Sequence, residues 1–340
     1  MATGKTPKVT YEPATDRYDR VDKDWFRRCG KTGLMLPAIS LGLWHNFGDA
    51  AKADNARRLC FTAFDRGITH FDLANNYGPP PGSAESRFGK ILKHLPREEL
   101  VISTKAGYKM WPGPYGDWGS RKYLLSSLDA SLKRLKLDHV DIFYHHRWDP
   151  KTPLDETMGA LDQAVKSGKA IYAGVSNYGG NQLLRAVKKT KSIKANPLLI
   201  NQVCYNMLQQ GPREDMFETA KTNGVGVICF CPLAQGLLTD RYLGGEIPKD
   251  SRAADITSFL KPDRITTEMR GKLHKLNDHA RSRGQTLAEM ALSWVLSDNR
   301  VTSCLIGASK PEQIEQNVKA LSNTKFTGEE LKLLNDICNA

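Results

Sequence analysis

Eight short apolar segments typical of β-strands recur along this chain, and segments with helical periodicity separate them. The expected strands span residues 38–44, 69–74, 100–106, 139–146, 170–177, 198–205, 226–233 and 302–308. Amphipathic segments bounded by Gly and Pro lie between them, for example 121–135, 154–167 and 285–297. This order predicts an α/β fold with a parallel sheet, and eight units are the number that closes a (β/α)8 TIM barrel.

The main alternative is a doubly wound open sheet. A sheet of that kind that binds a dinucleotide usually carries G-x-G-x-x-G at its first turn, and this sequence has no such pattern, which favours the barrel. We expect residues 24–37 to form a hairpin across the barrel bottom, and the Gly-rich segment 236–262 to be a long loop that covers a cofactor. Residues 25–340 are expected to form a single domain after a polar extension, residues 1–24.

Composition excludes several classes of protein. No apolar run approaches the roughly 20 residues that cross a bilayer, and the polar start of the chain predicts a cytoplasmic protein. The seven cysteines are scattered, so we expect neither a disulfide framework nor a metal site, even at the close pair Cys229 and Cys231. The net charge of +12 is spread along the chain without a nucleic-acid-binding motif, so we expect an anionic small molecule as partner; a homo-oligomer is compatible with the sequence.

Polar residues stand at three successive strand ends, where barrels of this kind build their active sites. Asp72 closes the second strand, Lys105 the third and His146 the fourth, and Tyr77 follows in the loop after the second. A buried carboxylate needs a cation, and the neighbouring strand supplies Lys105. A structural ion pair would explain Asp72 and Lys105 alone, and of His145 and His146 only one can face the barrel mouth.

These four residue types suit the reduction of a carbonyl group. We expect the Lys105 ammonium to stabilise the phenolate of Tyr77 and so make it a usable proton donor. His146 could hydrogen-bond the same carbonyl oxygen. No Ser-His-Asp or Cys-His pattern supplies a nucleophile, which favours a hydride from a bound nicotinamide. A lyase or isomerase with a Lys105 Schiff base would need a depressed lysine pKa, which Asp72 opposes.

Seven motifs in order resemble the signatures of the aldo-keto reductase superfamily over about residues 25–338. They are FDLANNYG, STKAG, VDIFYHHR, GVSN, INQVCYN, CPLAQGLLTDRY and LIGASKPEQIEQNV. The segments PPPGSAE, GYKMWPGPYGDWGSRKYL and KDSRAA are most similar to the branch that holds bacterial L-glyceraldehyde 3-phosphate reductases and the β subunits of voltage-gated potassium channels.

This resemblance implies roles for individual residues. Tyr77 would be the proton donor, Lys105 and Asp72 would tune its pKa, and His146 would orient the carbonyl; spacing from Asp141 selects His146 over His145. The residues that would bind NADPH are Trp44, Asp72, Ser176, Asn177, Gln202, Phe230, Cys231, Pro232, Leu233, Ala234, Gln235, Gly236, Leu237, Arg241, Arg252, Gly307, Ser309, Lys310, Gln313, Gln316 and Asn317. The substrate pocket would contain Trp44, Tyr77, Trp111, His146, Arg147 and Trp148.

Two positions depart from the family pattern, since His145 stands where a small residue is more usual and Gln316 where an acid is. The expected function is NADPH-dependent reduction of small aldehydes such as L-glyceraldehyde 3-phosphate or methylglyoxal. The alternative is a cofactor-binding, redox-sensing regulatory subunit like the channel β subunits. Those subunits carry Asn at the position of His146, so this histidine favours catalysis. Local sequence permits two interpretations of residues 307–317, a capped helix start with Pro311 at its first position or a phosphate site at a helix N-terminus.

Overall fold

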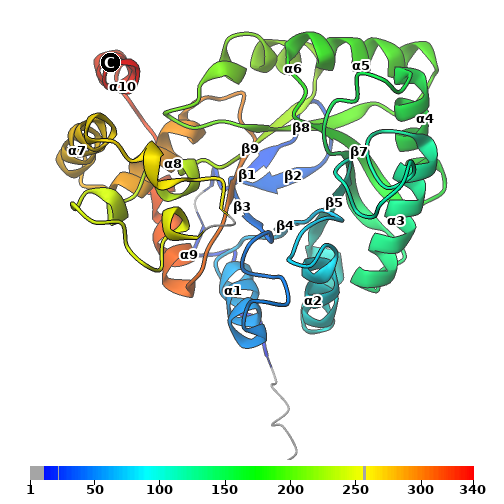
Figure 1. Ribbon diagram of the computed structural model, residues 1–340, viewed down its shortest axis with the longest axis horizontal. Coiled ribbons are helices and arrows are strands. Elements are labelled where there is room, and N and C mark those ends of the chain that lie inside the picture. The colour runs from blue at the N-terminus through cyan, green and yellow to red at the C-terminus, as the bar shows by residue number, and fades with distance from the viewer. Residues whose placement is uncertain (1–10, 22, 256–257) are drawn as a thin grey trace, which may run out of the picture.

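Eight parallel strands close into a barrel at the centre of the protein, in a computed structural model that describes residues 11–21, 23–255 and 258–340 (Figure 1). Each strand pairs with the next in chain order, and the last closes the ring against the first. The barrel strands are β3 (Ile39–Gly42), β4 (His70–Asp72), β5 (Val101–Ala106), β6 (Val140–His145), β7 (Ala170–Ser176), β8 (Leu198–Cys204), β9 (Gly226–Phe230) and β10 (Ser303–Ile306). The predicted (β/α)8 barrel is therefore confirmed, with all eight strands where the sequence placed them.

Helices surround the barrel as an outer ring (Figure 1). They are α1 (Ala53–Asp65), α2 (Ser83–Ile91), α3 (Arg121–Leu135), α4 (Leu154–Lys166), α5 (Gly180–Ser192), α6 (Met216–Asn223), α8 (Leu287–Ser297) and α9 (Pro311–Val318). Two further helices lie outside this ring: α7 (Thr267–Ser282) packs on α8, and α10 (Gly328–Asn339) packs on α7. Side-chain caps define several starts: Ser120 accepts a hydrogen bond from the Tyr123 amide, and Thr286 and Glu289 form a reciprocal capping box. Within the described residues, no helix is long and apolar enough to span a membrane.

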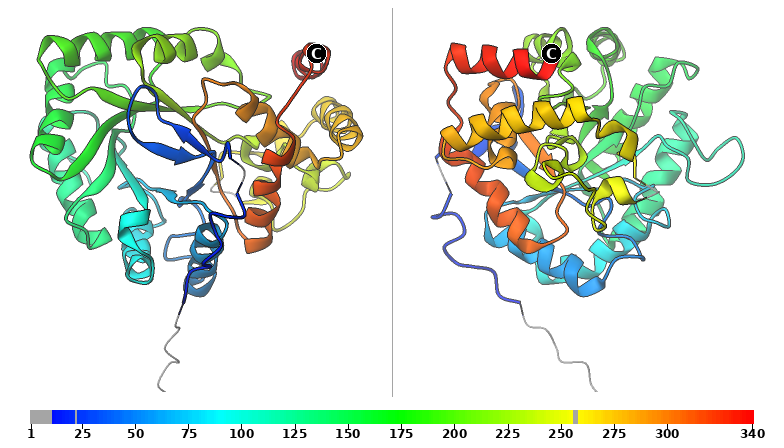
Figure 2. Two further views of the ribbon diagram at one scale, coloured as in Figure 1. Left: turned by 180° about the vertical axis from the view of Figure 1, so that it is seen from behind. Right: turned by 60° about the vertical axis from the view of Figure 1, so that its left-hand side comes forward.

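A two-stranded antiparallel hairpin, β1 (Phe26–Arg28) and β2 (Met35–Pro37), closes the amino-terminal end of the barrel, as predicted (Figure 2, left). Its turn docks on the start of β9, where the Lys31 amide donates to the Gly224 carbonyl at 2.9 Å. Gly30 has a φ of +56°, and a Cβ there would lie 2.2 Å from the same carbonyl oxygen, so only glycine fits. Cys29 and Leu36 pack against the apolar part of the barrel interior.

A long connection follows β9 and passes over the carboxyl-terminal mouth of the barrel. The sequence predicted that the strand would continue to residue 233, but β9 ends at Phe230 because Cys231 adopts a left-handed backbone with a φ of 53°. The described part of the connection contains four short 3₁₀ helices before α7: Ala234–Gly236, Asp240–Tyr242, Arg252–Ala254 and Pro262–Arg264. Residues 256–257 of the predicted loop, and residues 1–10 and 22 of the predicted extension, lie outside the described residues.

Candidate active site

The Lys105 ammonium is the centre of the site at the carboxyl-terminal mouth. Its Nζ lies 2.5 Å from Asp72 Oδ2, 2.6 Å from the Leu73 carbonyl oxygen and 3.3 Å from the Tyr77 hydroxyl. The side chains of Lys105 and Asp72 are both completely buried. An ammonium has three protons, and here three oxygens surround it. The acid at the end of β4 is therefore buried together with the cation it needs.

Tyr77 is held so that its own proton can be donated. Because the ammonium donates to the phenol oxygen, the O–H of Tyr77 is free for another acceptor. Burial raises the pKa of Tyr77 well above its ordinary value, and the Asp72 carboxylate raises it further. Desolvation of the phenolate is the largest influence on the pKa of Tyr77, and the stabilisation by Lys105 that the sequence led us to expect stays a prediction. Burial also lowers the pKa of Lys105, and Asp72 opposes that shift.

His146 faces Tyr77, whereas His145 points to the opposite side of β6. The His146 ring lies 6.0 Å from the Tyr77 ring in an edge-on arrangement, and 4.7 Å from the ring of Tyr108. His145 Nδ1 instead hydrogen-bonds the Tyr178 hydroxyl at 2.8 Å, outside the barrel. Burial, followed by the Lys105 charge, lowers the pKa of His146 well below its usual value. His146 is therefore neutral and has one N–H for a carbonyl oxygen.

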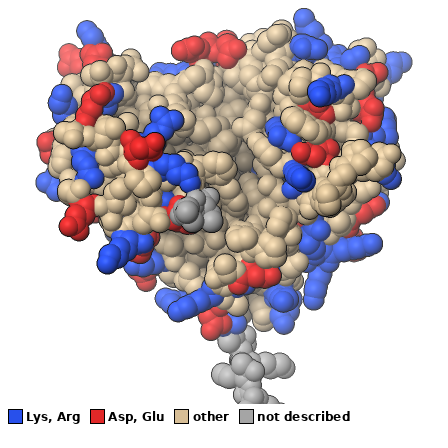
Figure 3. Space-filling view, viewed as in Figure 1, with Lys and Arg blue, Asp and Glu red and all other residues tan. Residues whose placement is uncertain are grey.

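Aromatic side chains from two distant segments form a wall beside Tyr77. The Trp44 ring stacks on Tyr77 with ring centroids 5.8 Å apart. Phe259, from the long connection, also packs against the Trp44 ring, with centroids 5.6 Å apart. Through this contact, the connection after β9 packs against the segment that follows β3. Figure 3 shows this face hollowed near its centre, with Lys and Arg spread around the rim and Asp and Glu among them.

The predicted pocket residue Arg147 lies next to His146. It is surrounded by aromatic residues that the sequence analysis did not name individually. Its guanidinium lies 4.4 Å from the Tyr108 ring centre and 3.7 Å from that of Trp118, and it pairs with Asp117 at 2.6 Å. Tyr108 and Trp118 belong to the aromatic loop after β5, and its composition was the only signal for them. Two other predicted pocket residues pack elsewhere in the rim: Trp111 against Tyr123 and Trp148 against Tyr178.

Three amide and hydroxyl side chains border the cluster of Asp72, Lys105 and Tyr77 on the side of β7 and β8. Gln202 Nε2 donates to Asp72 Oδ1 at 3.1 Å, and Ser176 Oγ donates to the Gln202 carbonyl at 2.9 Å. Asn177, with a φ of 57°, donates to the His146 carbonyl at 3.1 Å. Half-buried Phe230 ends β9 beside Cys204. These residues are close enough to act on one bound group.

The connection after β9 contains polar atoms suited to an anionic ligand. Cys231, Ala234 and Gln235 all have positive φ, so the backbone turns sharply at the strand end. Gln235 Oε1 and Ser251 Oγ are buried without a hydrogen-bond partner. The Ser251 hydroxyl can donate to an anion, whereas Gln235 Oε1, an amide oxygen, can only accept a hydrogen bond. The other predicted residues here are Pro232 and Leu237, which are buried; Leu233 and Gly236, which are half-buried; and Arg241, which pairs with Asp250.

Arg252 places a largely buried guanidinium between this connection and Gly307. Desolvation lowers the pKa of Arg252, with Cys231, Tyr242 and Asp255 acting in the opposite direction. A Cβ on Gly307 would lie 3.4 Å from the Arg252 guanidinium. A cation that burial destabilises in this way favours a phosphate as neighbour, so the residues here fit a dinucleotide.

The start of α9 is capped by its own side chain. Gln313 Oε1 accepts from the Ser309 amide at 2.8 Å, from the Ser309 hydroxyl at 3.1 Å and from the Lys310 amide at 3.3 Å. The capped-helix interpretation therefore describes this structure, and a phosphate would have to displace Gln313. Lys310 is exposed, Asn317 is buried, and exposed Gln316 donates to Thr286 at 3.4 Å.

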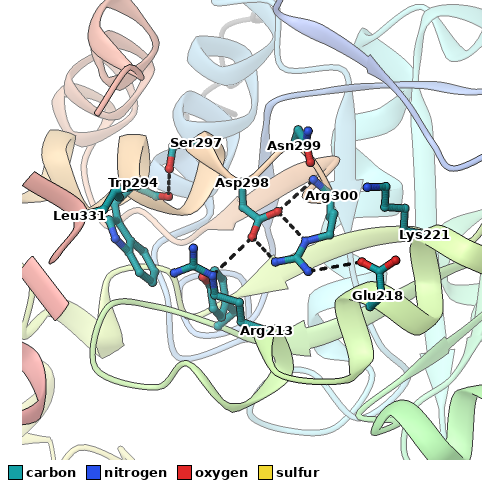
Figure 4. A pocket seen from close by; sticks show the side chains of 10 residues that line it. Arg213, Glu218, Lys221, Trp294, Ser297, Asp298, Asn299, Arg300 and Leu331 are labelled. Carbon is teal, nitrogen blue, oxygen red and sulfur yellow. Dashed lines mark hydrogen bonds and ion pairs between the residues drawn. The ribbon is translucent and has the colours of Figure 1, made fainter. Parts of the chain in front are cut away.

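A second cavity, of about 380 Å³, lies away from this site, beside α6 and the end of α8 (Figure 4). Its charges compensate one another: Arg300 pairs with Asp298 at 2.7 Å and approaches Glu218 at 3.8 Å, and Arg213 approaches Asp298 at 3.8 Å. The neighbouring groove beneath the hairpin contains Arg27, whose guanidinium donates to two carbonyl oxygens. These groups are satisfied within the protein. Among the described residues, no cluster of His, Cys, Asp or Glu could hold a metal ion.

Comparison with known proteins identifies relatives across nearly the whole chain. The model of the Aldo/keto reductase family matches residues 38–339. The L-glyceraldehyde 3-phosphate reductase of Escherichia coli (strain K12) is 54% identical over 323 residues, which cover 93% of this chain and 92% of the relative. A probable voltage-gated potassium channel subunit beta of Arabidopsis thaliana is 34% identical over 302 residues, covering 87% and 90%. A putative subunit of the same kind from Schizosaccharomyces pombe is 35% identical over 326 residues, covering 92% and 93%.

Proposed function

The chain belongs to the aldo/keto reductase family, a family of oxidoreductases, and from this premise we propose that it reduces small aldehydes with NADPH. The observation that carries the proposal is the environment of Lys105, whose ammonium contacts Asp72, the Leu73 carbonyl and the phenol of Tyr77. This arrangement leaves a tyrosine proton directed away from the lysine, beside a neutral histidine. A carbonyl oxygen between the two would accept both hydrogen bonds.

In this proposal each residue acts on one part of the reaction. The nicotinamide supplies the hydride when the cofactor is bound. Tyr77 donates its proton to the carbonyl oxygen, and Lys105 stabilises the phenolate that remains. The His146 N–H fixes the direction of the carbonyl oxygen. Trp44 and the long connection exclude water from the site, which strengthens these interactions.

The cofactor would lie along the ends of β7 to β10. Ser176, Asn177 and Gln202 would hold the carboxamide, with Phe230 against the ring. The unpartnered hydroxyl of Ser251, which can donate, and the buried guanidinium of Arg252 support a pyrophosphate position in the connection after β9. At the other end of the cofactor, Lys310 would meet the 2′-phosphate.

L-glyceraldehyde 3-phosphate is the first substrate to test, because the 54% identical relative is named for its reduction. Arg147 would bind the phosphate of such a substrate beside His146 if the phosphate took the place of Asp117, with which its guanidinium pairs at 2.6 Å. Methylglyoxal is the second. We propose a cytoplasmic enzyme that acts on free small molecules.

The regulatory alternative has its own support, because relatives 33–35% identical are named as potassium channel β subunits. A regulatory protein needs cofactor binding but no turnover. His146, positioned against Tyr77, favours the catalytic function.

The deciding experiment measures NADPH consumption with L- and D-glyceraldehyde 3-phosphate, methylglyoxal and 4-nitrobenzaldehyde. The Tyr77→Phe variant keeps the ring against Trp44 and loses only the hydroxyl. We expect its turnover to fall by roughly 10² to 10⁴, the usual contribution of a general acid, with NADPH affinity nearly unchanged. Near-normal turnover in this variant would refute the role of Tyr77, and NADPH binding without turnover of any aldehyde would support the regulatory alternative.

A further inference from the structure

A chain of hydrogen bonds continues from the catalytic carboxylate into the interior of the barrel. Ser103 Oγ lies 2.6 Å from Asp72 Oδ1, and His70 Nε2 lies 3.0 Å from Ser103 Oγ. On the other side of the imidazole, Nδ1 lies 2.9 Å from Ser40 Oγ, which lies 2.7 Å from Ser303 Oγ. All five residues are completely buried. The chain crosses β4, β5, β3 and β10, and the first three strands lie side by side in Figure 1.

The direction of every hydrogen bond in this chain follows from the carboxylate. Asp72, paired with an ammonium, can only accept, so Ser103 must donate its single proton to it. Ser103 must then accept from His70, which requires the proton of the imidazole to be on Nε2. Burial lowers the pKa of His70 to about 4, so the ring is neutral and Nδ1 accepts from Ser40. Ser40 has then used its proton, and Ser303 donates to it.

All four donors are therefore oriented towards Asp72, so that their dipoles favour its negative charge. The two carboxylate oxygens of Asp72 receive different donors. Oδ1 receives Ser103 and Gln202, and Oδ2 remains for Lys105. A carboxylate rotated about its Cβ–Cγ bond would lose this division and move the ammonium away from the tyrosine.

We infer that His70 is a positioning residue for the reaction: acting through Ser103, it fixes the orientation of Asp72 and thereby keeps Lys105 against Tyr77. This inference rests on the proposed reductase function. The chain of hydrogen bonds does not serve as a route for protons from solvent. It ends at Ser303, which is buried and has no further hydrogen-bond partner among the residues that the structure describes.

The first test is the imidazole tautomer in the intact protein at pH 7. Nitrogen-15 chemical shifts of labelled histidine report which ring nitrogen carries the proton, and comparison with the His70→Gln variant assigns the His70 signals. We expect the Nε2–H form. The Nδ1–H form would overturn the inference, because Ser103 could not then both receive from the ring and donate to Asp72. This measurement needs no turnover, so it remains valid if the proposed function fails.

The second test compares three variants of residues buried in the barrel interior. His70→Leu removes both hydrogen bonds, whereas His70→Gln retains an amide donor for Ser103. Ile200→Val is the matched control, a small loss of volume in the same interior away from the chain. We expect His70→Leu to lower kcat roughly 10- to 100-fold, the usual effect of losing an outer partner at a buried charged centre, with KM and NADPH affinity within about threefold. His70→Gln should recover most of kcat.

The outcomes separate this inference from the function on which it rests. Unchanged kcat in His70→Leu, or a kcat in His70→Gln as low as in His70→Leu, would overturn the positioning role while leaving a reductase with a functional Tyr77. A loss of kcat in Ile200→Val as large as in His70→Leu would also overturn it, because packing alone would then be responsible. Failure of the Tyr77→Phe test would refute the proposed proton donor, without changing the tautomer result.

Discussion

Replacing Lys105 by Met should destabilise the protein strongly, because it leaves the Asp72 carboxylate buried with no cation. Lys105 and Asp72 are both inaccessible to solvent and 2.5 Å apart, and the Leu73 carbonyl loses its donor as well. Breaking a buried pair from one side costs about 3–5 kcal/mol. For a chain of this length that corresponds to a fall in Tm of roughly 4–7 °C.

The double variant Asp72→Asn/Lys105→Met should be more stable than Lys105→Met, since no isolated charge remains in the interior. Lys166→Met is the control. It removes a lysine that also pairs with an aspartate, Asp162 at 2.8 Å, but whose side chain is 62% exposed. Exposed pairs contribute about 0–1 kcal/mol, so this variant should resemble the wild type.

Urea unfolding at pH 7 measures all four free energies, and a pH series adds a check on the cause. Without its cation Asp72 should have a pKa raised above the unfolded value of about 3.9. A raised carboxyl pKa destabilises the native state at neutral pH, and the penalty disappears as pH falls towards the unfolded pKa. The deficit of Lys105→Met relative to wild type should therefore shrink between pH 7 and pH 4. This account of the pair would be refuted if the unfolding free energy of Lys105→Met were within 1 kcal/mol of the wild-type value. It would also be refuted if the double variant were less stable than Lys105→Met.

Three further predictions concern histidines and the cofactor. His146→Asn should depress aldehyde reduction while His145→Ser retains most activity, because only His146 faces Tyr77; equal losses in steady-state assays would contradict this. Lys310→Ala should weaken NADPH by roughly 10- to 100-fold and NADH hardly at all, with exposed Lys319→Ala as control; equal weakening of both cofactors in fluorescence titrations would contradict a phosphate contact. The pKa values of buried His70 and His145 are lowered to about 4, so the unfolded chain binds more protons below pH 6.5. Stability should therefore fall by about 2 kcal/mol for each at pH 5, and urea midpoints that do not change between pH 7 and 5 would contradict it.

The barrel, and the cluster of polar residues at its mouth, were predictable because their signals are local. Strand composition, helical periodicity and the polar residue at each strand end can all be found within a dozen consecutive residues. Asp72 and Lys105 could be paired because neighbouring parallel strands end at one edge. The early end of β9 was missed because the left-handed backbone of Cys231 depends on the tertiary course of the connection, and nothing in its residue type indicates it.

The hydrogen-bond chain was missed for a different reason. Its members come from positions 40, 70, 103 and 303, and their proximity depends on the registers of four strands. A partial signal was present. His70 and Asp72 have the same parity on one strand, as do Ser103 and Lys105 on the next, so each pair points to the same side of the sheet. Knowing that this side is the barrel interior requires the closed structure.

The barrel interior is divided between two kinds of side chain, and the division follows the chemistry. Towards β6, β8 and β9 it is filled mainly by Ile142, Ile200 and Ile228, with the ring of buried Tyr144 beside them. Towards β3, β4, β5 and β10 it contains hydroxyls and an imidazole that could be replaced by apolar groups of similar volume. Such a replacement would be expected to stabilise an ordinary barrel, because buried polar groups contribute little when an apolar residue fits as well. The polar half is explained if Asp72 must remain charged and oriented, as the proposed reductase function requires. A variant with both Ser40 and Ser303 changed to Ala leaves the buried Nδ1 of His70 without a donor, so it should lose about 1–3 kcal/mol of stability and also lose turnover. A variant that loses stability while keeping turnover would show that the polar half serves the fold instead.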